Sequence, residues 1–436
     1  ADAIAIGEKA GDGQRADLDA LVTRANLAAA ASPARRVAPA APPVVGFLRL
    51  DADTAIGEGP LLHPFHGLVG KPLDTARLEA AIEELYGWNI FESVRYELIR
   101  EGGQDGLLIR VKEKTWGPNY LQFGVALSSD MDGDGEWNIG GSMLKTALNE
   151  WAGEARFAAQ IGESPLVFVE FYQPLGDSLR WFGNVRALYD SRSFGRFEGN
   201  DVLEEYRVHR YGGDVSFGRT IADWGEARVG LRRFSGDAEI RVGDPATPEV
   251  DFDNFELYGK ITYDTLDNRN FPHSGALASL EWIEATEDLG GDDDFTQLLA
   301  HAAGAYTWDR NTLFGGVQFD YTADHEAPIQ NRFRVGGFTR LSGFALDEIS
   351  GQQVLLLRSG YYRRLDVKLL PVYVGMSLEY GNAYEERDDI TLDPDEAILA
   401  ASVFLGMDTI LGPVYLSYGH AEAGNDSVYL FLGRLF

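Results

Sequence analysis

After Trp116 the sequence alternates between apolar and polar residues along almost all of its remaining length. In the stretch "YLQFGVALS", for example, one face carries only apolar side chains, those of Leu121, Phe123, Val125 and Leu127. Alternation with a period of two predicts strands that are apolar on one face and polar on the other. Roughly sixteen such segments follow up to Phe436, each near the length of about ten residues that a tilted strand needs to cross a bilayer.

The connections between these segments fall into two groups. Links such as residues 235–253 and 323–351 are long and often acidic, whereas "GDS", "DRN" and "LG" are short. Long and short links alternate along the chain. Such sorting is typical of outer-membrane barrels, and an even number of strands closes an antiparallel sheet. We therefore expect a mainly β fold, with a 16-stranded antiparallel transmembrane β-barrel over residues 116–436. The alternative is a soluble all-β protein with a two-sheet core, because alternation alone does not say which face is buried.

The first part of the chain differs in composition. Residues 1–31 have helical spacing, and residues 32–43 are a Pro- and Ala-rich linker. Residues 44–115 read as strand, helix and β-hairpin, with Asp74 as the helix N-cap and Gly87 as its end. We expect a small α/β module there. Since the chain starts without Met, we expect it to be a processed or truncated form.

Composition excludes several classes of partner and site. The chain has 68 acidic and 38 basic residues and a net charge of −30, which argues against binding nucleic acid or an anionic membrane face. Cysteine is absent, and no apolar run is long enough for a spanning helix. Asp130, Asp132 and Asp134 have calcium-loop spacing, but Gly141 takes the twelfth position, so we interpret this stretch mainly as a solvated acidic loop. We predict no metal, no cofactor and no catalytic residue.

The C-terminal segment "SVYLFLGRLF" places Val428, Leu430, Leu432 and Phe436 on one face, which Arg434 interrupts. It resembles the C-terminal signature by which outer-membrane barrels are handed to their assembly machinery. That resemblance implies contact with the barrel-assembly machinery, followed by contact with outer-membrane lipid and lipopolysaccharide.

Two further stretches narrow the resemblance. "YDTLDNRNFPHSG", residues 263–275, resembles a turn of the BamA/TamA superfamily, also called the outer membrane protein 85 superfamily. Its members place one or more POTRA modules before a sixteen-stranded barrel. Residues 44–115, with "LYGWNIFESVRYEL" at their centre, resemble a single POTRA. The resemblance implies a protein of the bacterial outer membrane with its POTRA in the periplasm.

The stretch "VGGFTRLSGF", residues 335–344, is glycine-rich like a phosphate loop, but no Lys-Ser/Thr follows its glycines and no helix begins there. In the superfamily the sixth external loop folds into the lumen and carries a Gly-Gly pair and a Val-Arg-Gly-Phe/Tyr tip. The pair is matched by Gly336 and Gly337. The tip is matched by Leu341, Gly343 and Phe344, with Ser342 where the family usually has Arg.

This departure puts the family's usual buried ion pair in doubt. Arg340, two residues earlier, is the candidate to take over the contact of the missing arginine. Glu379 and Arg358 lie on the polar faces of their predicted strands. A Lys or Arg that faced lipid at mid-depth would cost about 2–4 kcal/mol, so we expect charged side chains to point into the lumen. Our hypothesis is that Arg340 or Ser342 hydrogen-bonds Glu379 and holds the loop.

A helical segment, one POTRA and a barrel together resemble the type Vd secretion proteins, the PlpD-like patatin phospholipases. In that family a patatin-like lipase precedes the POTRA, which implies that this chain secretes or displays a passenger on its own N-terminal side. The chain contains no Gly-x-Ser-x-Gly, so no catalytic residue is carried over. The alternatives are an assembly or insertase factor of the same superfamily, a passive pore, and a surface-anchored enzyme.

Overall fold

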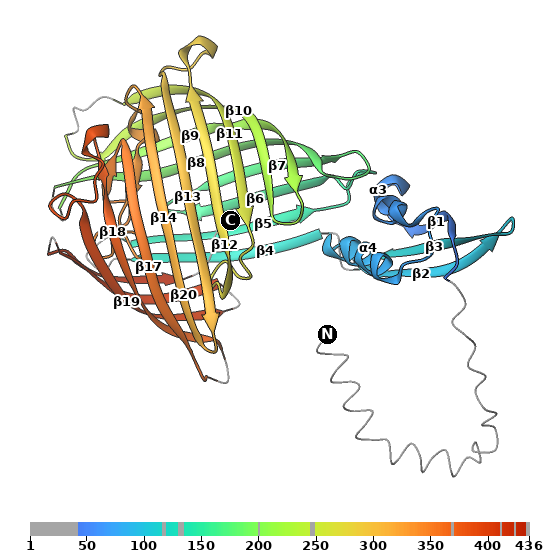
Figure 1. Cartoon of the computed structure of the whole chain (residues 1–436). Helices are drawn as coiled ribbons and strands as arrows, with labels where there is room; N and C mark the ends of the chain where they lie inside the picture. Colours follow the sequence, from blue (N-terminus) through green and yellow to red (C-terminus); the bar gives the residue numbers. More distant parts are fainter. Residues whose placement is uncertain are drawn as a thin grey trace.

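The computed structural model describes residues 42–115, 119–129, 135–198, 201–244, 249–367, 370–409, 412–422 and 424–432. These residues form a small N-terminal module and a large β-barrel (Figure 1). The predicted helical segment 1–31 and nearly all of the predicted linker 32–43 lie outside the described residues. Among the residues described, no helix is both long enough and apolar enough to cross a membrane.

The N-terminal module has three strands and two α-helices. Along the chain these are β1 (Val45–Asp53), α3 (Glu58–Leu62), the 3-10 helix η2 (His63–Leu68), α4 (Thr75–Gly87), β2 (Phe91–Glu101) and β3 (Gln104–Glu113). The strand order is β1-β3-β2, with β1 parallel and β2 antiparallel to β3. Asp74 caps α4 as predicted, because its carboxylate accepts from the N–H groups of Ala76 (3.1 Å) and Arg77 (3.3 Å).

The module rests against turns at one end of the barrel. The N–H of Gly57 donates to the carbonyl of Glu150 at 2.9 Å, and the Tyr120 hydroxyl donates to the carbonyl of Asn89 at 2.8 Å. Ala147 and Ala152 of the same turn are buried with the module's apolar core. The end of the barrel that carries these turns is called the module side below, and the opposite end the far side.

The barrel closes on itself through sixteen strands, as predicted. The strands are β4 (Asn119–Ser129), β5 (Gly135–Lys145), β6 (Glu154–Gly162), β7 (Leu166–Leu175), β8 (Trp181–Glu198), β9 (Asp201–Ile221), β10 (Gly225–Val242), β11 (Val250–Asp264), β12 (Ser274–Ala285), β13 (Phe295–Trp308), β14 (Asn311–Asp324), β17 (Gln353–Leu365), β18 (Val372–Tyr384), β19 (Ile398–Thr409), β20 (Gly412–Ala421) and β21 (Asp426–Leu432). Every neighbouring pair is antiparallel, and β21 returns to pair with β4. A closed single sheet rules out the alternative of a two-sheet sandwich core.

The apolar faces of the strands point outward. Phe123 on β4 is 81% exposed and Met376 on β18 is 56% exposed, whereas Glu379 on β18 is fully buried. Aromatic side chains gather on the outer face at the module side, among them Trp181, Trp224, Tyr263, Tyr306 and Trp308. An apolar exterior edged by aromatic rings is the surface that a membrane-spanning barrel presents to lipid.

Candidate functional site: the inward loop and the strand seam

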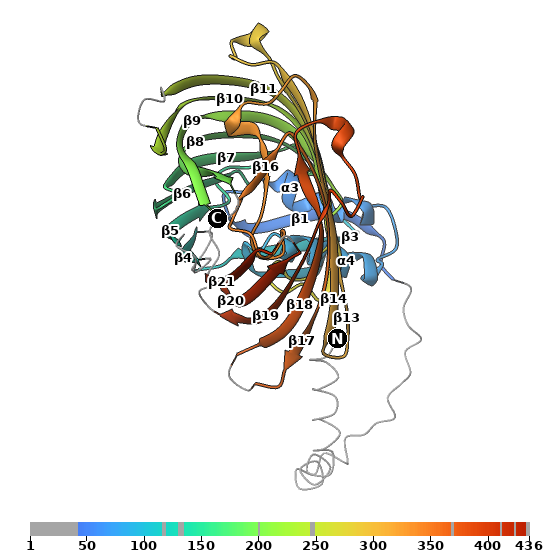
Figure 2. The same ribbon diagram turned by 90° about the vertical axis from the view of Figure 1, so that its left-hand side faces the viewer.

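The longest connection in the barrel is the inward loop, residues 325–352, between β14 and β17. It contains η4 (Ile329–Asn331) and the short antiparallel strands β15 (Phe333–Val335) and β16 (Ile349–Gly351). Viewed along the barrel, β16 lies inside the ring of strands (Figure 2). The loop therefore occupies the lumen, as the resemblance implied.

Apolar packing holds the loop against one wall. Val335, Leu341 and Phe344 are buried with wall residues from β17, β19 and β20, namely Val354, Leu356, Ala400 and Ala421. These side chains give the loop an apolar core of its own inside a lumen that is otherwise polar. Their burial stabilises the docked loop at about 25 cal/mol per Å² of apolar surface.

The glycines of the loop allow tight turns and close approach to the wall. Gly336 and Gly343 have φ angles of 128° and 113°, which residues with a Cβ rarely adopt. A Cβ on Gly343 would lie 2.6 Å from the carbonyl oxygen of Asn425 and 2.8 Å from the nitrogen of Ala421. The sequence pattern that resembles a phosphate loop thus has a conformational reason.

Two wall side chains bind the backbone of the loop tip. The N–H of Ser342 donates to Glu379 Oε2 on β18 at 3.0 Å. The N–H of Gly343 donates to the Tyr429 hydroxyl on β21 at 2.7 Å, and that hydroxyl donates to the carbonyl of Phe344 at 2.6 Å. Three successive residues of the tip are therefore fixed to two strands.

The structure places the predicted site residues in different roles. Ser342 reaches Glu379 through its backbone, while the Arg340 guanidinium donates to Asp347 (3.1 Å) and to the Arg334 carbonyl (2.5 Å) within the loop. Arg358 is the cross-strand neighbour of Glu379, yet within the described part of the chain no ion pair joins the two. Arg340 thus braces the loop internally, and Ser342 makes the contact with the wall.

The base of the loop is bound to the opposite wall. Asn331 accepts from the side-chain amide of Asn254 at 2.8 Å and donates to Glu256 at 3.4 Å, both on β11. The Arg334 guanidinium lies 4.4 Å from the ring centroid of Phe194 on β8. The inward loop therefore spans the lumen from β18 and β21 to β8 and β11.

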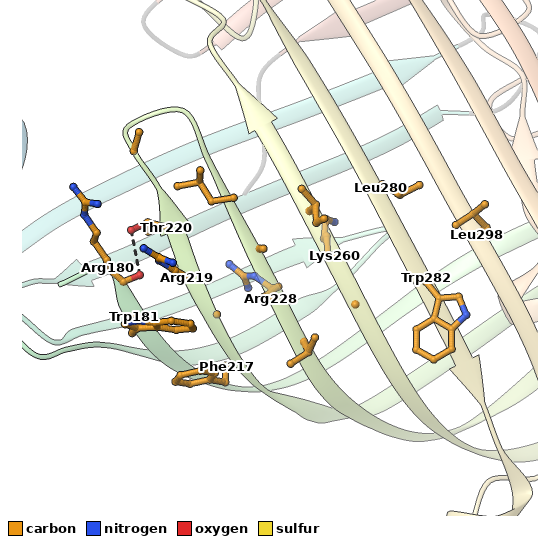
Figure 3. Close-up of a pocket in the computed structure, with 17 residues that line it drawn as sticks. Arg180, Trp181, Phe217, Arg219, Thr220, Arg228, Lys260, Leu280, Trp282 and Leu298 are labelled. Atoms are coloured by element: carbon orange, nitrogen blue, oxygen red, sulfur yellow. Dashed lines mark hydrogen bonds between the residues drawn. The ribbon is translucent and has the colours of Figure 1, made fainter. Parts of the chain in front are cut away.

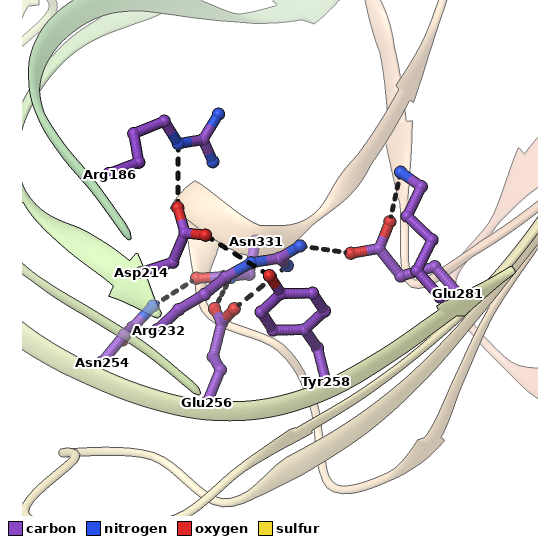
Figure 4. A network of polar contacts seen from close by, with 9 residues as sticks. Arg186, Asp214, Arg232, Asn254, Glu256, Tyr258, Glu281 and Asn331 are labelled. Atoms are coloured by element: carbon purple, nitrogen blue, oxygen red, sulfur yellow. Dashed lines mark hydrogen bonds and ion pairs between the residues drawn. The ribbon is translucent and has the colours of Figure 1, made fainter. Parts of the chain in front are cut away.

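A polar network supports this second attachment (Figure 4). Arg232 of β10 lies 3.7 Å from the ring centroid of Tyr258 and contacts Glu281 (2.5 Å) and Glu256 (3.6 Å). Lys260 donates to the other oxygen of Glu281 at 2.9 Å. The sequence gives no signal for this network beyond the polar faces of β10 to β12, because the pairing of its members depends on the register between these strands.

On the module side, the turn between β11 and β12 enters the barrel. Phe271 is only 1% exposed, and its ring stacks on Tyr373 (4.3 Å between centroids) and tilts against Tyr415 (5.0 Å). Phe338 of the inward loop contacts Tyr415 from its own side at 5.4 Å. Tyr415 of β20 is therefore the point where the inward loop and the module-side turn meet.

Backbone hydrogen bonds keep this turn compact. Asp267 accepts from the N–H groups of His273 (2.8 Å) and Ser274 (3.0 Å). Burial opposes ionisation of the Asp267 carboxyl, but these N–H donors and nearby His273 outweigh it and lower its pKa. The turn motif at residues 263–275 thus inserts the Phe271 ring into the lumen, and hydrogen bonds within the turn hold its two ends together.

The barrel closes at the seam between its first and last strands. In the described residues, three residue pairs join β21 to β4, running from Leu432 opposite Leu127 to Leu430 opposite Ser129. The ladder between β20 and β21 has seven pairs. Val428, Leu430 and Leu432 share the outer face as predicted, while Phe436 lies outside the described residues.

Comparison with known proteins gives one family and several solved structures. The Omp85 superfamily domain matches residues 154–396. Among solved structures, BamA from Haemophilus ducreyi lacking POTRA domains 1–3 has a TM-score of 0.71 and 14% identity over 89% of this chain and 83% of that one. CdiB from Acinetobacter baumannii has a TM-score of 0.60 and 11% identity over 90% and 74%, and CdiB from Escherichia coli 0.59 and 12% over 89% and 76%. No curated protein matched the sequence. At these sequence identities, the similarity to solved structures supports the fold alone.

Proposed function

Because the chain belongs to the Omp85 superfamily, we propose that this outer-membrane barrel is a translocator for a passenger on its own N-terminal side. In this proposal the N-terminal module is a POTRA that stands in the periplasm, and the far side of the barrel faces the cell exterior. The passenger is a patatin-like lipase, as in type Vd secretion. The barrel-assembly machinery inserts the chain, and outer-membrane lipid and lipopolysaccharide surround it.

The module offers a place to receive an extended client chain. Its strand order leaves β2 at the edge of the sheet, and Tyr96 and Leu98 on β2 are exposed. An extended peptide can add to such an edge through main-chain hydrogen bonds, with exposed side chains beside it giving selectivity. We infer that the passenger's linker adds to β2 before it enters the barrel.

The closure of the barrel between its first and last strands is the observation that carries the proposal. A passenger needs a path, and the lumen is crossed by the inward loop. β4 and β21 are the first and last strands of the barrel in chain order, so no turn connects them directly and they can separate without straining a loop, unlike β20 and β21. Opening this seam widens the lumen sideways and lets the passenger pass.

A disulfide across the seam tests this path. The chain has no cysteine, so Leu127→Cys with Leu432→Cys can form only the intended bond between cross-strand partners. With a reporter fused before Ala1, we expect the oxidised protein to leave the reporter protected from protease added to intact cells, and reduction to restore its display. The matched control, Leu416→Cys with Leu430→Cys, links β20 to β21 and should not block display. Equal display with and without the seam disulfide would contradict the proposal.

The second candidate is an assembly or insertase factor whose clients are other barrel proteins. It would use the same seam and the same β2 edge, so the seam disulfide does not separate the two functions. The purified chain in liposomes would then accelerate folding of an unfolded barrel client, while a fused reporter would stay undisplayed in cells. Display without such acceleration favours the translocator.

A further inference from the structure

A groove runs along the outer face of the barrel near its module side, across strands β8 to β13 (Figure 3). Its volume is about 850 Å³, which is within the range of ligand sites in proteins. The functions considered above make no use of it.

The groove exists because two outward-facing positions lack bulk. Ala227 of β10 and Gly259 of β11 form its floor between larger neighbours. A Cβ built on Gly259 would find only Val229 Cγ1 within 4 Å, at 4.0 Å. The walls are apolar and exposed, formed by Phe217, Val229, Ile261, Leu280 and Trp282. Such a channel suits a hydrocarbon chain.

Two arginines stand at the end of the groove next to the short turns. Arg219 lies on the outer face with Val215 and Phe217, and its guanidinium is 5.3 Å from the ring centroid of Trp181. Arg180 precedes Trp181, and its carbonyl accepts from the N–H of Thr220 at 2.8 Å. Cross-strand pairing of Trp181 with Arg219 therefore places both arginines at this rim.

Both arginines are exposed. The adjoining turn carries Asp223, but among the described residues no ion pair joins a carboxylate to Arg180 or Arg219. Arg186 and Arg228, on the inner face of the same strands, do pair with Asp214 (2.8 Å) and Glu226. In a chain of net charge −30, two exposed arginines at one rim, with no ion pair among the described residues and one of them over an aromatic ring, form a candidate anion site.

We propose that this groove binds one anionic phospholipid, whose phosphate contacts Arg180 and Arg219 and whose acyl chain lies over Gly259. Trp181 marks the level of the headgroups, because indole rings concentrate at the boundary between hydrocarbon and water. The strong net negative charge of the chain argued against an anionic membrane face as a partner, but attraction at close range depends on the local pair of arginines. Placing this lipid in the periplasmic leaflet rests on the orientation given above, whereas binding itself does not.

Lipid titration of the detergent-solubilised full chain, followed by native mass spectrometry, tests the proposal. The probes are phosphatidylglycerol and phosphatidylcholine with identical acyl chains. We expect the first phosphatidylglycerol to bind at least about fivefold more tightly, the effect of roughly one basic residue near an anionic headgroup. Equal binding of both lipids would show only unspecific acyl contact and would overturn the proposal.

Three variants locate the site. Arg180→Gln with Arg219→Gln should abolish the preference for phosphatidylglycerol, and Gly259→Leu, which fills the floor, should weaken both lipids. The matched control is Arg363→Gln, which removes an exposed arginine at the module-side end of β17 that does not line the groove. A preference that survives the double substitution would overturn the proposal. If the double variant fails to fold, Arg219→Gln is measured alone. It should remove at least about half of the preference for phosphatidylglycerol, because each arginine contributes to binding of the anionic headgroup. An unchanged preference would overturn the proposal.

Discussion

Replacing Glu379 by alanine is expected to release the tip of the inward loop. The Glu379 carboxylate is fully buried and accepts the Ser342 N–H at 3.0 Å. Hydrogen bonds to charged groups contribute about 1.5–3 kcal/mol, and a buried N–H left without an acceptor costs about 1–3 kcal/mol. Among the described residues the other oxygen, Oε1, has no hydrogen-bond partner, so undocking hydrates it and offsets part of this stabilisation. We expect a net loss of about 2 kcal/mol in docking.

A loss of about 2 kcal/mol raises the open fraction of the loop about 30-fold, since each 1.4 kcal/mol is a factor of ten. Because the natural chain has no cysteine, a single Ala400→Cys under the loop reports on opening through its rate of maleimide labelling. Ala400 is 1% exposed, so the docked loop shields it. Glu379→Ala should speed labelling by about that factor, and Glu379→Gln, which keeps an acceptor, by much less.

Ser142→Ala is the matched control, because its hydroxyl is buried and donates to Gln122 Oε1 on β4 at 3.4 Å. It should label like the parent. If Glu379→Ala and Ser142→Ala label at the same rate, the Ser342 contact does not hold the tip and the reasoning from the buried hydrogen bond is refuted.

Three further outcomes are expected. Phe271→Ala removes the ring stacked on Tyr373, and should raise ion conductance through the barrel in planar bilayers. Arg334→Ala loses the contact with the Phe194 ring, and should make the inward loop more sensitive to protease in detergent. The lowered pKa of Asp267 means that its charged form stabilises the folded turn; this contribution is complete above its ordinary value of 3.8 and is lost as pH falls through the lowered pKa. Asp267→Asn should therefore lower the melting temperature at pH 7 and have little effect well below pH 3.8.

The barrel was predictable because its constraint is local. The side-chain period of a strand is two, so the sequence of each segment shows which residues share a face. On β18, Ser377 and Glu379 are buried and Met376 is exposed, as the alternation of polar and apolar residues predicts. Strand number and the sorting of loops follow from the same reading. The sequence also identified the inward loop and the inward-facing Glu379.

The partners across the lumen were not predictable, because they depend on how the sheet curves and closes. Asn331 binds Asn254 over a separation of 77 residues, and the Tyr415 hydroxyl donates to the carbonyl of Asn270 over 145 residues. No sequence periodicity encodes such separations. Arg340 failed to reach Glu379 for a local reason. Leu341 adopts a left-handed φ of 76°, which reverses the backbone between Arg340 and Ser342, and the contact to the carboxylate then uses a backbone N–H that any residue but proline would supply.

The seam and the inward loop are coupled through shared contacts. Tyr429, which binds Gly343 and Phe344 at the loop tip, belongs to β21, the strand that closes the barrel. The next strand, β20, carries Tyr415, which contacts the inward loop through Phe338 and the module-side turn through Phe271. Moving β21 away from β4 therefore pulls on the hydrogen bonds of the tip and strains the aromatic cluster beneath it. In the proposed translocation, a client that adds to the free edge of either strand would replace the lost ladder bonds, so the event that opens the wall would also loosen the inward loop.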